Sequence, residues 1–525
     1  MKKNPKILWI TVLVLGWLFD FLFWKQSIGI NFAIYTLFCL IGGLFILRMD
    51  EKQPSPGTMW LFPLILFFAV VTFARAEPMS LFLGVISTLF LMSILAMTYL
   101  GGRWLRYSLA DYVSGLFKLA GSMFVQPLSF NSEVKREQAG NGESIKNFNL
   151  WPILRGIVIA LPIVAIFAAL LASADAIFSQ QLGLFIKFFR IENLPQYIFR
   201  FVYILVGAYL LAGVFLHTSM QSKDEKLIGE DRPLVNPFLG FTETTVVLGS
   251  VAVLFAAFVV IQFRYFFGGQ ANINVAGFTY SEYARRGFGE LLAVAIFSLL
   301  MILGFGTAAR RENDKERHIY SGLSTAIVLL VMAMLVSAYR RLLLYETAYG
   351  FSRLRTYTHV ILIWIGLLLG AVVILEILHR QRAFAIAVLI TSLGFVATLG
   401  LMNVDGFIVR QNVNRATSGH GLDVPYLVSL SSDSVPVLVN EFRSTALPGL
   451  TRDAVGAILF CRLHADPPQP DKGWQSFTLS GWQAKAAIKG VKPQLDRYRV
   501  INDQWPLEIL TPGSVSYNCY GNGME

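Results

Sequence analysis

Long runs of apolar residues, separated by short polar stretches, dominate this chain. A run of about 18 to 25 apolar residues is long enough to cross a bilayer as a helix. We find about eleven such runs, near residues 7–24, 28–47, 58–74, 79–99, 151–173, 195–217, 244–265, 286–308, 319–347, 353–378 and 384–402. Apolar residues do not alternate with polar ones, as they do in the strands of a membrane barrel. The pattern predicts an all-α polytopic membrane protein.

The remaining stretches suggest how the chain is organised. Residues 103–130 combine apolar and polar side chains at helical spacing, so we expect a helix that lies along the inner membrane surface. After about residue 403 the hydrophobicity drops, while short amphipathic helical patterns continue. The predicted regions are a four-span segment (1–102), an amphipathic helix with a cytoplasmic loop (103–150), a seven-span core (151–402) and a soluble, mostly helical region (403–525). Short strands near 457–462 and 497–510 are an alternative within the last region.

Composition supports the membrane class and argues against a nucleic-acid partner. Hydrophobic residues make up 55% of the chain and charged residues only 15%, with a mean hydropathy of +0.57. Soluble domains have about 25% charged residues. The net charge of +11 is not arranged in a basic stripe or recognition motif. In a membrane protein, Lys and Arg set orientation and meet anionic lipid instead.

The loop charges predict an orientation. If the N-terminus is inside, most Lys and Arg residues of the loops lie on the cytoplasmic side. An odd number of spans then places the C-terminal region outside. The basic start and apolar run of residues 1–25 resemble a signal peptide, but the run is too long and no A-x-A-like site follows it. We therefore predict a first span that is retained, in a bacterial cytoplasmic membrane.

The cysteines and the metal-binding motifs give little information about function. Cys461 and Cys519 both fall in the predicted outer region, where a disulfide is permitted. Two cysteines alone do not establish a bridge, so both states stay open. The chain has no C-x-x-C or H-E-x-x-H motif, and we predict neither a metal site nor a cofactor.

One predicted span begins with charges. In "FTYSEYARRGFGELL" (278–292), Thr279 and Glu282 fit a capping box, so the helix should start before the membrane. Glu282, Arg286 and Glu290 are four residues apart and share one helix face, with Arg285 beside them. This stripe could bind a ligand or could neutralise itself.

A second charged segment, "YRRLLLYETAYGFSRLRTYTH" (339–359), joins two predicted spans. Gly350 is placed to end one helix and Ser352 to cap the next, which predicts a tight helical hairpin that projects outward. Arginine suits bidentate binding of phosphate or carboxylate, and tyrosine suits an interface with one wet end. The candidate binding residues of this hairpin are Arg340, Arg341, Tyr345, Arg353 and Arg355.

A third segment, "NVDGFIVRQNVNR" (403–415), follows the last span on the same predicted side. It adds Asp405 and Arg410 to the candidate set, with Asn412 and Arg415 close by. If the three segments meet, they form a polar, outward-facing site near headgroup level. Charged residues elsewhere at span ends, such as Asp20 and Glu376, are expected to be solvated there.

The three segments also resemble a known group of proteins. "YSEYARRGFGELLAVA", "SAYRRLLLYETAYGFSRLRTYTHVILIW" and "NVDGFIVRQNVNRATSGHGLDVPYLVSLSSDSVPVL" are similar to signature segments of bacterial membrane proteins in the related domain-of-unknown-function families 4153 and 4173. The resemblance covers roughly residues 245–500. It implies a multi-span fold with a helical tail and no particular activity, and no catalytic residue can be carried over.

Three functions fit the pattern. We favour a binding or regulatory protein whose outer site recognises an anionic headgroup or an envelope partner. A transporter or flippase of a lipid or small anion is the first alternative, although no inverted repeat or midplane carboxylate supports it. An outer-leaflet transferase or hydrolase is the second. Its general base would be Glu282, Glu290 or Asp405, and nearby arginines would weaken such a base by lowering its pKa.

Overall fold

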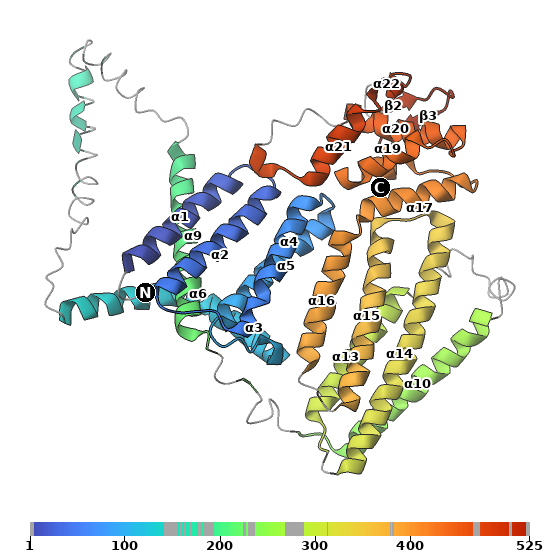
Figure 1. The fold of residues 1–525 in the computed structure, drawn as a ribbon, viewed down its shortest axis with the longest axis horizontal. Coiled ribbons are helices and arrows are strands. Elements are labelled where there is room, and N and C mark those ends of the chain that lie inside the picture. Colours follow the sequence, from blue (N-terminus) through green and yellow to red (C-terminus); the bar gives the residue numbers. More distant parts are fainter. Residues whose placement is uncertain are drawn as a thin grey trace. The chain divides into compact units, whose positions relative to one another are not determined.

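A computed structural model describes residues 5–140, 194–223, 227–228, 237–267, 288–311, 313–378, 380, 383–465, 473–502 and 507–520, with separate positions between 151 and 193. Long apolar helices dominate it, which confirms the all-α polytopic prediction (Figure 1). They are α1 (Pro5–Phe23), α2 (Ile30–Met49), α4 (Leu61–Ala74), α5 (Pro78–Thr98), α9 (Leu194–Gln221), α10 (Phe241–Phe267), α13 (Phe288–Ala308), α14 (Asp314–Tyr349), α15 (Arg353–Ile377) and α16 (Phe384–Leu401).

Within the described residues, ten helices are long and apolar enough to cross a membrane. They coincide with ten of the predicted spans, and the third includes the short helix α3 (Pro56–Met59). The remaining predicted span, near 151–173, falls largely outside the described residues. The amphipathic stretch forms η1 (Trp104–Arg106) and the helix α6 (Leu109–Gly140).

The chain divides into two compact units. Unit 1 comprises Met1–Trp24, Cys39–Lys52 and Leu119–Met220. Its helices α1 and α9 approach closely at Gly16, where an added Cβ would lie 2.9 Å from the carbonyl oxygen of Ile204 and 3.3 Å from Ala208 Cβ. Small residues allow such approaches between membrane helices, where the hydrophobic effect does not drive association.

Unit 2 comprises Lys25–Phe38, Gln53–Lys118 and Gln221–Glu525. Its membrane helices pack in a series: α4 on α5, α5 on α16, α16 on α15, α15 on α14, and α14 on α10 and α13 (Figure 1). The third and fourth predicted spans therefore pack against helices from the second half of the chain. The 36 residues of α14 correspond to about 54 Å, longer than a hydrocarbon core of about 30 Å, so this helix must extend beyond it.

The C-terminal region is mainly helical, as predicted. Its elements are α17 (Val404–Thr417), α18 (Val424–Val428), η3 (Ser432–Ser434), α19 (Val435–Arg443), α20 (Gly449–Ala465), η4 (Trp474–Ser476), α21 (Leu479–Lys489) and α22 (Lys492–Leu495). The strands β1 (Arg499–Asn502), β2 (Glu508–Leu510) and β3 (Ser516–Asn518) form an antiparallel sheet in that order. The alternative of a strand near 457–462 is wrong, because these residues lie inside α20.

This region packs directly on the ends of the membrane helices of unit 2. One buried core joins Val360 of α15 and Leu399 of α16 to Ile408, Leu438 and Ile458 of α17, α19 and α20. A disulfide links the cysteines of α20 and the chain just after β3, Cys461 and Cys519. The C-terminal region (403–525), which we call the tail, is therefore attached through a continuous apolar core to the helices that carry the predicted site.

Candidate functional site

The turn between α14 and α15 is as tight as the sequence predicts. Gly350 follows α14 with φ at 82°, a region that favours glycine. A Cβ at this position would also lie 2.5 Å from Asn412 Oδ1. Ser352 is the N-cap residue of α15, although its side chain makes no capping hydrogen bond. The two helices form the expected hairpin.

Two side chains of helix α17 form hydrogen bonds with this turn. Asn412 accepts a hydrogen bond from the backbone N–H of Phe351 (3.0 Å) and donates one to the carbonyl oxygen of the same residue (2.9 Å). Arg415 donates from Nε to the carbonyl oxygen of Thr347 (3.0 Å) and from Nη2 to that of Ala348 (2.8 Å). These bonds satisfy carbonyl groups left free at the end of α14. The hairpin and the 403–415 segment, two of the three charged segments, therefore meet.

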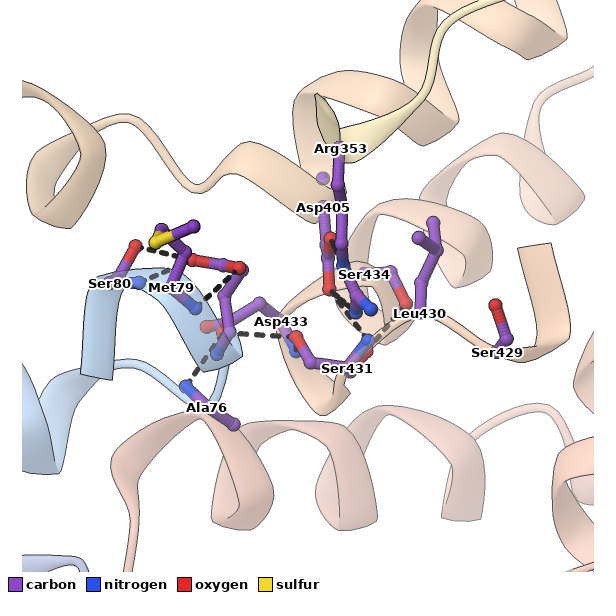
Figure 2. A network of polar contacts seen from close by, with 12 residues as sticks. Ala76, Met79, Ser80, Arg353, Asp405, Ser429, Leu430, Ser431, Asp433 and Ser434 are labelled. Carbon is purple, nitrogen blue, oxygen red and sulfur yellow. Dashed lines mark hydrogen bonds and ion pairs between the residues drawn. The ribbon is translucent and has the colours of Figure 1, made fainter. Parts of the chain in front are cut away.

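Arg353 and Asp405 bind each other. The guanidinium donates from Nε to Oδ1 (2.8 Å) and from Nη2 to Oδ2 (2.6 Å), a bidentate pair between α15 and α17. Asp405 is fully buried, and its Oδ2 also accepts a hydrogen bond from the backbone of Ser431 (2.6 Å). Figure 2 shows Arg353 above Asp405 with Ser431 beside them. Both charges are occupied within the protein.

The network continues to the start of α5. The Oδ2 atom of buried Asp433 accepts hydrogen bonds from the backbone N–H groups of Ala76 (2.7 Å) and Glu77 (2.8 Å) (Figure 2). Burial raises the pKa of the Asp433 carboxyl group. Buried Glu77 in turn caps α5 through Met79 and Ser80 and accepts a hydrogen bond from the hydroxyl of Tyr357.

We call Glu77, Arg353, Asp405 and Asp433 the polar clamp, since they join α5, α15, α17 and η3. Glu77 and Asp433 are not among the site residues predicted from the sequence. Glu77 stands directly before Pro78 at the start of an apolar run, which is a helix-start signal. Nothing in the sequence relates Asp433 to a loop more than 350 residues earlier.

A different group of side chains lies at the tip of the hairpin. The guanidinium of Arg355 stacks over the ring of Tyr345, 4.1 Å from its centroid, and donates a hydrogen bond to the carbonyl oxygen of Gly350. The ring of Tyr349 lies 5.0 Å from that of Tyr345. We call Tyr345, Tyr349, Arg355 and Arg415 the tip cluster.

The tip cluster carries positive charge, and no carboxylate among the described residues pairs with it. Burial and the neighbouring charge of Arg355 lower the pKa of the Arg415 guanidinium. In the part of the chain that the structure describes, no carboxylate forms an ion pair with Arg355 or Arg415. Two like charges that are partly desolvated and close together favour a bound anion.

The other predicted residues are dispersed. Arg341 donates from Nη2 to Gln262 Oε1 of α10 (2.8 Å), on the α14–α10 contact. Arg340 and Arg410 are exposed on α14 and α17, and Glu290 is exposed in the first turn of α13. Three candidates lie outside the described residues: Glu282, Arg285 and Arg286.

Unit 1 contains a buried ion pair that was not predicted from the sequence. Asp20, expected to be solvated at a span end, is buried instead, and that expectation is wrong. Arg200 of α9 donates to both of its carboxylate oxygens, with Nε 2.9 Å from Oδ1, and stacks over Trp24 at 5.1 Å. Such pairs avoid leaving a lone charge in an apolar environment. An arginine inside the apolar run 195–217 was the available signal.

One cavity lies at the other end of α15. Its volume is about 210 Å³, and α13, α15, α16 and the start of α6 line it with mostly apolar side chains together with Glu376. Among the described residues, no group of three or more His, Cys, Asp or Glu side chains is placed to hold a metal ion. The tip cluster and this cavity are thus separate candidates.

Comparison with known families gives one match. Residues 62–441 match DUF4153, a domain of unknown function. The match begins within the third predicted span, well before the segment 245–500 on which the resemblance rests, and it ends within α19. Neither the curated proteins nor the solved structures contain a match to the chain. Because the matched region covers most of the sequence and includes the hairpin, α17 and the start of α5, the chain belongs to the DUF4153 family.

Proposed function

We propose that this multi-pass membrane protein binds an anionic, phosphate-bearing headgroup at the tip cluster. The observation that carries the proposal is the pair of neighbouring arginines, Arg355 and Arg415, which have no carboxylate partner among the described residues. A bound anion would offset their mutual repulsion. The bilayer supplies such groups at the level where transmembrane helices end.

The geometry of Arg355 suits a phosphate ligand. One of its terminal nitrogens is occupied by Gly350, and the ring of Tyr345 supports the guanidinium plane. The remaining donors of the planar fork can bind two oxygen atoms of one phosphate. Tyr349 is exposed, and its ring packs beside the ring of Tyr345. Such a site recognises the headgroup and leaves the acyl chains in the bilayer.

The polar clamp supports a regulatory role for this binding. Arg355 belongs to a membrane helix, whereas Arg415 belongs to α17, the first element of the tail. The clamp and the shared apolar core hold these elements together. A headgroup that contacts both arginines would therefore stabilise the attachment of the tail to the membrane helices.

The proposal does not require catalysis. Both oxygens of Asp405 already accept hydrogen bonds from Arg353, and Ser431 contributes another. A general base needs a free lone pair within reach of its proton. Transport of a lipid or small anion is the second candidate, and the cavity beside Glu376 is the observation that favours it.

Orientation is part of the proposal. We infer that the N-terminus is inside and that the tail, with the tip cluster, lies on the outer side of a bacterial cytoplasmic membrane. The disulfide between Cys461 and Cys519 supports this side, because disulfides persist in oxidising compartments. A reporter fused after Glu525 should be active only outside the cytoplasm, and activity inside would reverse the assignment.

Native mass spectrometry with lipid identification tests the headgroup site. The full chain is purified with bound lipid as wild type, Arg355→Gln and Arg499→Gln. We expect Arg355→Gln to weaken retention of anionic phospholipid at least about tenfold, since a charge-assisted hydrogen bond contributes about 1.5–3 kcal/mol. Arg499 is exposed on β1 and serves as the matched control. Equal retention by all three proteins would refute the proposal.

A further inference from the structure

A buried pair of ionisable side chains lies below the tip cluster. Glu346 is fully buried three residues before the end of α14, and His359 lies in the second turn of α15. His359 Nδ1 is 3.4 Å from Glu346 Oε1. The ring of Tyr339, on α14, lies 4.7 Å from the imidazole ring. The tight turn at Gly350 brings the two helices together here.

Neither side chain has an adequate hydrogen-bond partner. Within the described part of the chain, both carboxylate oxygens of Glu346 and Nε2 of His359 are buried without a hydrogen bond. The distance of 3.4 Å between Nδ1 and Oε1 is longer than a well-formed hydrogen bond. Buried polar groups are normally satisfied, so each exception requires an explanation.

The charge of the pair depends on the number of protons that it holds. With no proton the site is an ionised carboxylate beside a neutral imidazole, and with two protons it is a carboxylic acid beside an imidazolium. Both states place an uncompensated charge in a buried site, which is unfavourable. With one proton the pair is neutral. A carboxylic acid that donates to the imidazole nitrogen also gives both groups a hydrogen-bond partner.

Among the residues that the structure describes, the surrounding elements place no further counter-charge in contact with the pair. Arg355, one turn before His359 on α15, acts on Glu346 at a distance but is directed to Gly350 and Tyr345. From α17, Arg415 is directed to the last carbonyl groups of α14. On the other sides, α10 offers Gln262, which is bound to Arg341, and α13 carries the exposed Glu290.

We propose that Glu346 and His359 form a buried proton-binding site that holds a single proton. The Glu346 carboxyl group carries this proton, and its O–H group donates a hydrogen bond to His359 Nδ1. Release breaks the Oε1–H bond and transfers the proton to water, which leaves a carboxylate that must be rehydrated. The ends of α14 and α15 would then separate or admit water. Proton occupancy of this site is thus coupled to the packing of the hairpin. The inference does not depend on headgroup binding.

Infrared difference spectroscopy on the full chain in nanodiscs tests the site. At neutral pH the wild type should show the carbonyl stretch of a protonated carboxyl group, and Glu346→Gln should lose it. Glu290→Gln is the matched control, because it removes an exposed carboxyl group in the first turn of α13 and should leave the band unchanged. A wild-type spectrum with no band that is sensitive to Glu346→Gln would overturn the proposal.

A second variant guards against misfolding of the first. In His359→Asn the carboxyl group keeps its proton but loses the imidazole acceptor, so the carbonyl stretch should shift. Size-exclusion chromatography and circular dichroism verify that each variant remains folded. An unshifted band in folded His359→Asn would also overturn the proposal, since it would show that the imidazole does not accept a hydrogen bond from the carboxyl group.

Discussion

Single residues determine the geometry of the hairpin tip. Gly350 provides both a left-handed backbone conformation and room for the Asn412 side chain. Asn412 then holds the turn through Phe351, and Arg415 holds the end of α14. Because Arg355 donates to the carbonyl of Gly350, the position of its guanidinium depends on this turn.

Gly350→Ala should therefore destabilise the protein. A side chain at the φ and ψ of Gly350 costs about 1–3 kcal/mol, and the contact with Asn412 adds to this. We expect a lower melting temperature in thermal unfolding of the purified protein. Gly366→Ala is the matched control in the interior of α15, where an added Cβ meets nothing within 4 Å. A melting temperature unchanged by Gly350→Ala would contradict this account of the turn.

The Arg353–Asp405 ion pair of the polar clamp should also be sensitive to substitution. Asp405→Asn removes the counter-charge of Arg353, and breaking a buried ion pair costs about 3–5 kcal/mol. We expect early loss of the tail's protection in limited proteolysis, together with a lower melting temperature. Arg497 is exposed in the same region, so Arg497→Gln should change neither measurement. Full protease resistance in Asp405→Asn would show that the pair does not anchor the tail.

At the scale of elements, local signals sufficed for the helices. Hydrophobic run length located the spans, and Gly350 with Ser352 marked the hairpin. The hairpin and α17 were expected on the same side of the membrane, but their contact was left open until the structure showed it. The clamp onto α5 was not expected, because a contact between Asp433 and Ala76 leaves no local pattern in either segment. The burial of Glu346 was also hidden, since a helix-end glutamate resembles a solvated one until its neighbours are known.

The disulfide is an element-scale constraint on the tail. It joins α20 to the chain after β3 across a sequence separation of 58 residues. Closing a loop of this length stabilises the folded state by about 4 kcal/mol in the chain-entropy description. We expect Cys461→Ala with Cys519→Ala to unfold the tail at lower temperature and to abolish the effect of reductant on unfolding.

Cys39 provides the control for this measurement. It is a buried cysteine of α2 outside the Cys461–Cys519 bridge, so Cys39→Ala should leave the response to reductant intact. If reductant does not change unfolding of the wild type, the bridge does not stabilise the tail.

At the scale of the whole molecule, unit 2 combines membrane helices from both halves of the chain with the tail. The family match, from residue 62 to residue 441, spans the start of α5, the hairpin, α17 and η3, which together supply the polar clamp and the tip cluster. The charged groups of the polar clamp bind partners within the protein, whereas Arg355 and Arg415 have no carboxylate partner among the described residues. We therefore assign attachment of the tail to the polar clamp and headgroup binding to the tip cluster.

The most direct test is a cryo-electron microscopy map of the full chain in nanodiscs that contain anionic phospholipid. We predict headgroup density in contact with the guanidinium groups of Arg355 and Arg415, beside Tyr345. The density should be absent from a map of Arg355→Gln prepared in the same way. Well-resolved side chains of Arg355 and Arg415 with no headgroup between them would contradict the account.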